Sequence, residues 1–287
     1  MSVAFFVSDL HGRIDRYDAL FAAVGAERPA AVFLGGDLLP HPLARQSAPG
    51  HGIDDFLPGF LGQHLERLQT DLGTEYPRIF LIFGNDDPRS QEDDALTLES
   101  RGLLEYAHSR RIDWGPYPVY GYSFVPPTPF LLKDWERYDV SGFVDPGCVS
   151  PEEGWRSMPV PAGEVQRATI ERDLATLAGD DDLGRAIVMA HSPPYQTGLD
   201  RAALDGKSVD HAPLDLHVGS IAIRRFIEAR QPLLTLHGHI HESARLTGRW
   251  KEQIGRTWMM SAAHDGPELA LVRFDPEHLD AATRELR

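Results

Sequence analysis

The chain has 287 residues, of which 42% are hydrophobic and 25% are charged, a composition typical of folded globular proteins and not of disordered, collagen-like or coiled-coil chains. Its formal net charge of -15 argues against general binding to nucleic acids or to anionic lipids. A single cysteine, Cys148, allows no internal disulfide and no thiolate zinc site, and no stretch approaches the roughly 18 apolar residues of a membrane helix. The N-terminal residues lack the basic segment of a signal peptide, so we expect a cytoplasmic protein.

Short apolar runs that end in polar turns recur along the chain and predict β-strands. Their residues are apolar throughout rather than alternating with polar ones, which indicates sheets buried on both faces. These runs cover residues 3–7, 31–34, 78–83, 186–190 and 233–236. Two further strands are predicted at 257–261 and 268–274, separated by a turn at Asp265-Gly266-Pro267.

Amphipathic segments between the first three strands predict helices. Asp15 is the predicted N-cap of the first helix, and a second helix extends from Phe56 to Leu72 and ends at Gly73. A further helix is predicted at 220–229, just before the fifth strand. The order β-α-β-α-β at the start of the chain indicates an α/β protein.

The middle of the chain, from about residue 114 to 161, is rich in proline, glycine and aromatic residues. This composition favours extended or loop structure over helix. A structureless linker of that length is unusual in a compact domain, so we interpret the segment as a folded insertion that covers one edge of the functional site. Its aromatic side chains either stack on a nucleobase or form a small core, and we favour the core. They include Tyr120, Tyr122, Phe124, Phe130 and Trp135.

Polar clusters with potential metal ligands directly follow the first five predicted strands. Because the carboxyl ends of strands in an α/β sheet collect the binding loops, we expect these clusters to meet in space. The seven oxygen and nitrogen donors are Asp9, His11, Asp37, Asn85, His191, His239 and His241. A single metal with six protein ligands would leave no position for water, whereas two metals that share a carboxylate leave open positions, and we favour the pair. The donors fit Mn²⁺, Fe, Zn²⁺, Co²⁺ or Mg²⁺ without selecting among them.

The order of these motifs along the chain is similar to that of one known family. The motifs are Asp9-x-His11, Gly36-Asp37, Gly84-Asn85-x-Asp87, His191 and Gly238-His239-x-His241. Together they resemble the calcineurin-like metallophosphoesterase superfamily, over residues 1 to about 90 and about 165 to 275. The resemblance implies an α/β fold of two stacked mixed β-sheets flanked by helices, with residues 1–287 as a single domain.

The resemblance also implies a role for each donor. Asp9, His11 and His241 would hold one metal, and Asn85, His191 and His239 would hold the other. Asp37 would bridge the two ions. Two divalent cations outweigh the charges of Asp9 and Asp37, so an anion such as phosphate can bind locally on an acidic protein.

One position departs from that family. The motif there usually continues Gly-Asn-His, and the histidine gives a hydrogen bond or a proton toward the phosphate and the leaving group, whereas Asp86 stands in its place here. Two dications should lower the pKa of this carboxyl, so we expect it to be ionised and unable to donate a proton at neutral pH. Weaker help to the leaving group predicts a restricted substrate range. The alternative is that Asp86 is a further metal ligand.

Four other residues are predicted to orient a ligand or to contact the substrate, namely Asp87, Arg13, His237 and His264. Arg13 either contacts a phosphate oxygen or lies solvated at a helix start, and His237 either orients a ligand or packs within a buried strand. His264 either replaces the missing donor or lies near the rim without that role, and we favour the second interpretation. The other histidines are expected mainly at the surface, and they are His41, His51, His64, His108, His211, His217 and His278.

We therefore expect a metal-dependent phosphoesterase that cleaves a phosphodiester or nucleotide through attack of a metal-bound hydroxide on phosphorus. One alternative is a phosphomonoesterase, including a phosphoprotein phosphatase. Another is a non-catalytic metal-binding interaction module. The expected partner is a small-molecule or nucleotide phosphoester, and the sequence identifies no protein partner. The sequence lacks the P-loop and Gly-x-Ser-x-Gly patterns, which argues against those other chemistries.

Overall fold

The computed structural model describes residues 3–41 and 55–287, and most of its strands form two six-stranded sheets. The first sheet has the order β14-β13-β1-β2-β3-β4 and the second has the order β11-β12-β10-β7-β6-β5. The strands of the first sheet are β1 (Ala4–Val7), β2 (Ala31–Gly35), β3 (Arg78–Ile82), β4 (Glu105–Tyr106), β13 (Ala270–Phe274) and β14 (Thr283–Leu286). Those of the second are β5 (Arg111–Trp114), β6 (Tyr117–Tyr122), β7 (Ile187–Ala190), β10 (Leu234–His237), β11 (Lys251–Ile254) and β12 (Thr257–Ser261). A small hairpin consists of β8 (Ser208–Val209) and β9 (Ala212–Pro213).

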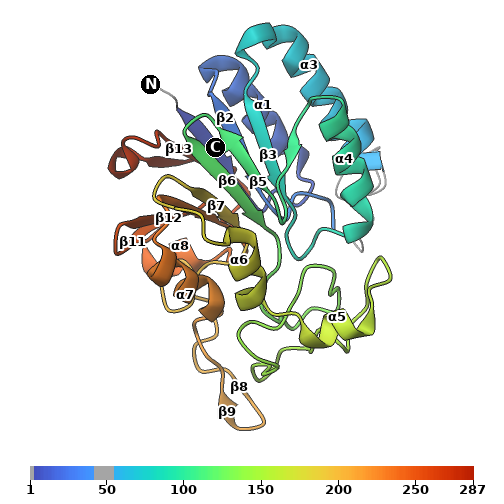
Figure 1. Cartoon of the computed structure of the whole chain (residues 1–287), viewed down its shortest axis with the longest axis vertical. Helices are drawn as coiled ribbons and strands as arrows, with labels where there is room; N and C mark the ends of the chain where they lie inside the picture. The colour runs from blue at the N-terminus through green and yellow to red at the C-terminus, as the bar shows by residue number, and fades with distance from the viewer. Residues whose placement is uncertain (1–2, 42–54) are drawn as a thin grey trace.

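Helices flank the two sheets on their outer sides (Figure 1). Beside the first sheet lie α1 (Ile14–Glu27), α3 (Gly62–Leu72) and α4 (Glu92–Ser100). Beside the second lie α6 (Ile170–Ala178), α7 (Ile221–Arg230) and α8 (Ser243–Thr247), and α5 (Ala162–Arg167) lies with the long connection after β6. Both sheets mix parallel and antiparallel pairs, so the predicted pair of mixed sheets flanked by helices is confirmed. Within the described residues, no helix has the length and apolar character needed to cross a bilayer.

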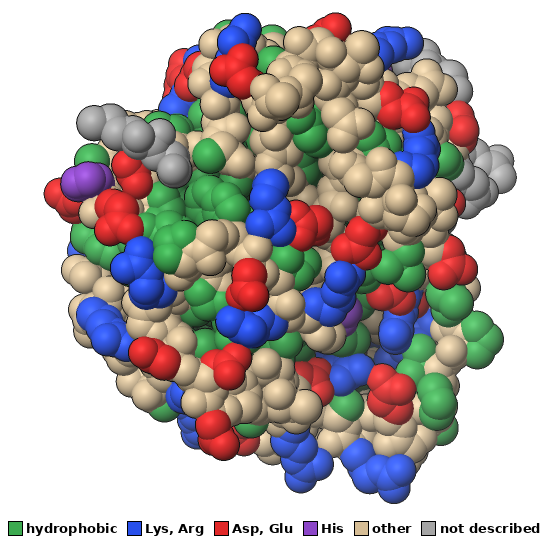
Figure 2. All heavy atoms as spheres, turned by 45° about the horizontal axis from the view of Figure 1, so that its top comes forward, with side chains coloured by type: hydrophobic (Ala, Val, Ile, Leu, Met, Phe, Trp, Pro, Cys, Tyr) green, Lys and Arg blue, Asp and Glu red, His purple; other side chains and the backbone are tan. Residues whose placement is uncertain are grey.

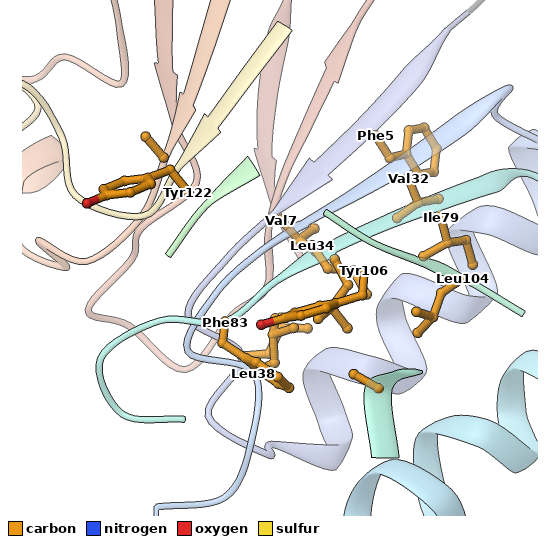
Figure 3. Packing of buried hydrophobic residues seen from close by; sticks show 14 of the residues in the cluster. Phe5, Val7, Val32, Leu34, Leu38, Ile79, Phe83, Leu104, Tyr106 and Tyr122 are labelled. Atoms are coloured by element: carbon orange, nitrogen blue, oxygen red, sulfur yellow. The ribbon is translucent and has the colours of Figure 1, made fainter. Parts of the chain in front are cut away.

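Alternate residues of each central strand serve two different cores. In β1, Ala4 and Phe6 belong to the cluster between the sheets, whereas Phe5 and Val7 belong to the cluster under the helices. Figure 3 shows Phe5, Val32 and Ile79 side by side across β1, β2 and β3, as the strand register requires. All four residues of β1 are buried, which confirms the prediction of strands covered on both faces.

The helix ends differ in detail from the predictions. Arg13, not Asp15, is the N-cap of α1, and it makes no capping bond through its side chain. Asp15 instead lies in the first turn, where a carboxylate favours the positive end of the helix dipole. The second predicted helix begins as a π-helical segment at Phe56–Leu61, around Pro58, which has no N–H to donate. Ser220 caps α7 by accepting a hydrogen bond from the Ile223 N–H at 3.0 Å.

The segment predicted as an insertion, 114–161, is partly sheet. Tyr117–Tyr122 form β6, which lies between β5 and β7 inside the second sheet. Residues 123–161, in contrast, contain no helix or ladder strand and are joined by isolated bridges such as Leu132 with Trp155. A fully buried ion pair between Lys133 and Glu136, 2.5 Å apart, fixes this connection internally.

Most aromatic residues of this region are buried, so they form part of a core as favoured. Tyr120, Tyr122, Phe124 and Trp135 are at most 4% exposed, which leaves none of them free to stack on a base, whereas Phe130 is 57% exposed. His108 packs among them, with its ring centroid 4.8 Å from that of Trp135. The expectation of a surface position for His108 was therefore wrong, and His51 lies outside the described residues.

Candidate metal centre

The strand register places the predicted ligands at one edge of the molecule. In the first sheet, Val7 pairs with Leu34 and Gly35 with Ile82, so the chain leaves three neighbouring strands at nearly one level. The turns that follow carry Asp9, His11, Asp37 and Asn85. In the second sheet Met189 pairs with Leu236, so that the turns with His191, His239 and His241 also follow neighbouring strand ends.

Four of the predicted ligands have left-handed backbone conformations. The φ angles are 57° at Asp9, 47° at His11, 52° at Asp37 and 74° at His239. Side chains other than glycine adopt this region at a cost of about 1 kcal/mol or more each, and such strain persists where the surroundings require it. These backbone conformations therefore lower local stability, and they direct the four side chains toward the candidate metal centre.

The structure brings one group of four ligands together. Asp9, His11, Asp37 and His241 each offer a donor atom, and these atoms lie within 4.8 Å of one another. The Nε2 atoms of His11 and His241 are 3.1 Å apart, and Nε2 of His241 is also 3.1 Å from Oδ1 of Asp9. Convergent lone pairs at such distances are suited to a shared cation.

A second group shares one residue with the first. Asp37, His191 and His239 also place donor atoms within 4.8 Å of one another, so Asp37 belongs to both groups. Asn85 is only 3% exposed, and its Oδ1 is a buried atom with no hydrogen-bond partner. An orphaned buried oxygen is costly, and a cation at this position would satisfy it. The donor set therefore fits the two-metal centre that the motifs imply.

His191 is oriented for ligation by its other ring nitrogen. Its Nδ1 lies 2.8 Å from the Gly35 carbonyl, which keeps a proton on Nδ1, so that Nε2 is the nitrogen that would bind a metal when it gives up its own proton. Nε2 has no hydrogen-bond partner and lies 3.2 Å from Oδ2 of Asp37. The hydrogen bond to β2 thus selects the tautomer that a metal ligand needs.

The pKa values of the protein alone reflect competition for protons among crowded groups. Burial lowers the pKa of His191, but Asp37 more than compensates and raises it to about 10. Burial and the charge on His191 lower the pKa of His239 to about 3. Burial opposes ionisation of Asp37, and His191 nevertheless lowers its pKa to about 2. Without metal, protonated imidazoles stabilise the ionised carboxylates. Divalent cations would take over that role.

Two glycines are required because the turns approach one another closely. A Cβ atom on Gly84 would lie 2.5 Å from His191 Nε2 and even closer to Oδ1 of Asp37. A Cβ on Gly238 would lie 2.7 Å from Oδ2 of Asp9. Both distances are well below van der Waals contact, so any larger side chain would displace a ligand.

Asp86 lies beside the first group and is half-buried. Its Oδ2 is 3.5 Å from Nδ1 of His11, and its backbone N–H donates to Oδ1 of Asp37 at 2.8 Å. In the protein alone, burial and the Asp37 charge raise the pKa of Asp86 to about 7. Two cations would act in the opposite direction.

Asp87 is fully buried and connects two of the ligand-bearing turns. Its carboxylate accepts hydrogen bonds from the N–H groups of Leu38 at 2.9 Å, Leu39 at 2.8 Å and Gly84 at 2.9 Å. Asp87 therefore holds the turn after β2 against the turn after β3, with no surface left for substrate.

Asp87→Asn is expected to reduce the free energy of unfolding by about 2 kcal/mol, because the new amide NH₂ faces a backbone N–H and leaves it unpaired. Urea titration monitored by circular dichroism measures the change. The matched control is Asp113→Asn, at a carboxyl whose side chain is 64% exposed, and it should change the stability little. Equal stability of the Asp87 and Asp113 variants would contradict the role given to Asp87.

The other predicted contact residues have different outcomes. Arg13 pairs with Asp15 at 2.7 Å at the start of α1, and His264 is 3.0 Å from Glu268. His237 is fully buried, with Nδ1 2.9 Å from the carbonyls of both Ala190 and Ser192. His237 is therefore packed in a buried strand and also holds the backbone on both sides of His191, so both interpretations of this residue apply.

Two residues near the ligands escaped the sequence analysis. The Ser8 hydroxyl donates to Oδ2 of Asp9 at 2.5 Å, and Arg16 donates to the Asp9 carbonyl. Ser8 lies next to a motif residue and could have been suspected as its partner. Arg16 has no such signal, because it occupies an ordinary position in the first turns of α1.

The family follows from comparison with known sequences. The sequence model of the calcineurin-like phosphoesterases matches residues 4–243, a range that includes all seven predicted ligands. The chain belongs to the calcineurin-like phosphoesterase family. It is accordingly a metal-dependent phosphoric ester hydrolase. No curated protein matches the sequence closely enough to count as a relative.

Solved structures support the same fold for this calcineurin-like phosphoesterase. The protein TT1561 of Thermus thermophilus is 16% identical, with a TM-score of 0.57 over 99% of this chain and 98% of the other. A dimetal phosphatase from Danio rerio is 13% identical, with a TM-score of 0.53 over 94% of this chain and 91% of the other. At these identities the likeness concerns the fold alone.

Proposed function

We propose that this calcineurin-like phosphoesterase uses two divalent cations to hydrolyse a phosphodiester or nucleotide. The observation that carries the proposal is the membership of Asp37 in both ligand groups, each with donor atoms within 4.8 Å of one another. One carboxylate between two clusters of imidazoles is the arrangement that a bridged metal pair requires. The orphaned Oδ1 of Asn85 supports the second position.

The residues of the chain have separable tasks in this proposal. Asp9, His11 and His241 would hold one cation, Asn85, His191 and His239 would hold the other, and Asp37 would be shared by both. When bound, the two ions polarise the phosphoryl oxygens and lower the pKa of water, which supplies the nucleophile. The Asp86 N–H fixes Oδ1 of Asp37, and the Gly35 carbonyl fixes the ring of His191. The identity of the metal stays open among Mn, Fe, Zn, Co and Mg.

With its pKa lowered by two bound cations, Asp86 would carry a charge that favours a diester over a monoester. A carboxylate so close to His11 adds negative charge beside the phosphate position. A monoester dianion is repelled more strongly than a diester monoanion by that charge. The face drawn in Figure 2 carries acidic and basic side chains interspersed, without a basic stripe, which is consistent with a small substrate.

A substrate panel tests this proposal. Metal-depleted protein is reloaded with Mn²⁺, Zn²⁺, Mg²⁺, Co²⁺ or Fe²⁺ and assayed with diesters, nucleotides, monoesters and phosphopeptides. We expect two metals per chain and the highest kcat/KM with a diester or nucleotide. Preference for phosphopeptides or for monoesters other than nucleotides would identify a phosphatase, and bound metal without hydrolysis of any substrate would identify a non-catalytic module. Either result would overturn the proposal.

Asp86→His is expected to raise kcat about 10-fold or more for substrates with poor leaving groups, because an imidazole N–H donates where an ionised carboxylate only accepts. Alkyl and p-nitrophenyl diesters are compared. The gain should be smaller for the p-nitrophenyl diester, because its leaving group, p-nitrophenolate, departs as a stable anion. Asp86→Asn is the control, since it removes the charge without adding an imidazole. An unchanged or lower rate with the alkyl ester would refute the argument.

A further inference from the structure

A buried arginine connects the first ligand turn with a distant turn of the chain. Arg16 of α1 is only 6% exposed, and its guanidinium donates to three backbone carbonyls. The acceptors are the carbonyl of Asp9, the carbonyl of Gly266 at 2.5 Å and the carbonyl of Pro267 at 3.4 Å. None of the three acceptors is a carboxylate. The five donors of a guanidinium are spread over three nitrogens and can reach three separated carbonyls, whereas the three donors of an ammonium group share one nitrogen.

The turn that Arg16 reaches, residues 262–267, is itself held at several points. The Ala262 N–H donates to the His237 carbonyl at 3.2 Å, and Arg284 donates to the Ala263 carbonyl at 2.6 Å. Arg245 of α8 pairs with Asp265 at 2.6 Å. This turn is therefore a fixed support rather than a loose loop, and an anchor on it transmits its position.

The 262–267 turn is also connected to Asp9 through the end of β10. Residue 237 is followed by Gly238 and His239, and the His239 N–H donates to Oδ1 of Asp9 at 3.0 Å. Arg16 thus completes a closed ring of contacts through Asp9, the 262–267 turn and the end of β10. Within this ring Asp9 has a left-handed backbone, and its N–H donates to the Gly36 carbonyl at 2.9 Å.

We propose that Arg16 is a positioning residue that fixes the Asp9 carbonyl to the 262–267 turn and thereby preforms the Asp9, His11 and His241 metal position. The inference rests on the proposed two-metal function. Arg16 touches neither a metal donor atom nor the substrate position in this account, and it acts through the backbone of Asp9. Loss of its fork releases a strained turn, so the first metal position loosens while the His191 and His239 position is retained.

Arg16→Lys is the decisive variant, because it keeps the positive charge and removes the fork. We expect about 10-fold weaker Mn²⁺ binding at the first position, the lower end of the effect of groups that orient metal ligands. Calorimetric Mn²⁺ titration is performed in the full chain and in His191→Ala, which lacks a ligand of the second position and so isolates the first. Arg16→Met removes both the charge and the guanidinium contacts. Because loss of the positive charge alone would strengthen cation binding, weaker Mn²⁺ binding in this variant is expected and would be due to geometry.

Arg230→Lys is the matched control, because the Arg230 guanidinium also donates to two backbone carbonyls, those of Gly179 and Asp181, outside the ligand turns and the 262–267 turn. It should lower the melting temperature of metal-free protein and leave Mn²⁺ affinity within about twofold of wild type. If Arg16→Lys lowers the melting temperature but leaves the Mn²⁺ affinity unchanged, Arg16 is only structural and the inference is wrong. If wild-type protein binds none of Mn²⁺, Fe²⁺, Zn²⁺, Co²⁺ and Mg²⁺, the proposed function fails instead, and the two failures are distinguishable.

Discussion

Asp37→Asn is expected to lower kcat/KM by about 10³-fold or more, because it removes the only carboxylate shared by the two ligand groups among the described residues. An amide oxygen can bind one cation, but it is neutral and cannot bridge two. The fold should persist, since the amide oxygen still accepts from the Asp86 N–H, now 2.8 Å from Asp37 Oδ1. Atomic emission after dialysis should find no more than one metal per chain.

The matched control for Asp37 is Asp18→Asn, at an exposed carboxyl on α1. It removes the same charge from the protein far from both ligand groups and should leave metal content and hydrolysis unchanged. If Asp37→Asn retained two metals per chain and wild-type kcat/KM, then Asp37 would not be the bridge and the two-metal proposal would lose its main support.

Gly84→Ala is expected to have the second largest effect, although it adds only one methyl group. The new Cβ would lie 2.5 Å from His191 Nε2 and closer still to Asp37 Oδ1, so both side chains must move. Overpacking of this kind costs about 1–3 kcal/mol of stability. Metal binding at the His191 and His239 position should weaken sharply because two of its ligands are displaced. Calorimetric metal titration and urea unfolding measure the two effects.

Gly25→Ala makes the same chemical change in the last turn of α1, where a Cβ would meet no atom within 4 Å. It should stabilise the protein by about 0.5–1 kcal/mol, since alanine favours a helix over glycine. The two variants therefore predict opposite signs for an identical substitution. Normal metal affinity in Gly84→Ala would show that the turns are looser than their packing indicates.

The central strands could be predicted from sequence because their burial leaves a direct signal. Strands covered on both faces are continuous apolar runs, and β7, β10 and β12 lie within one residue of the predicted bounds. The turns after such strands meet by geometry alone, so the convergence of the Asp and His side chains also followed. Edge strands such as β11 and β14 have mixed polar sequences without a continuous apolar run, although each pairs with the strand next to it in the chain, β12 and β13 respectively.

Strand β6 was hidden for a different reason. Pro118 and Gly121 lie within it, and both residues ordinarily argue against a strand interior. Gly121 is needed there because a Cβ would collide with the Ala107 carbonyl of a neighbouring segment. Asp87 shows the same limit in the candidate site. Its motif position was recognisable, but its three backbone partners belong to turns whose contact only the fold reveals.

The ligands come from both layers of the molecule, and this division has a mechanical consequence. Of the proposed ligands, Asp9, His11, Asp37 and Asn85 follow strands of the first sheet, and His191, His239 and His241 follow strands of the second. Each bound ion would therefore act as a cross-link between the two sheets. Occupancy of the centre and cohesion of the layers would be thermodynamically coupled, so that metal supply sets how readily the halves separate.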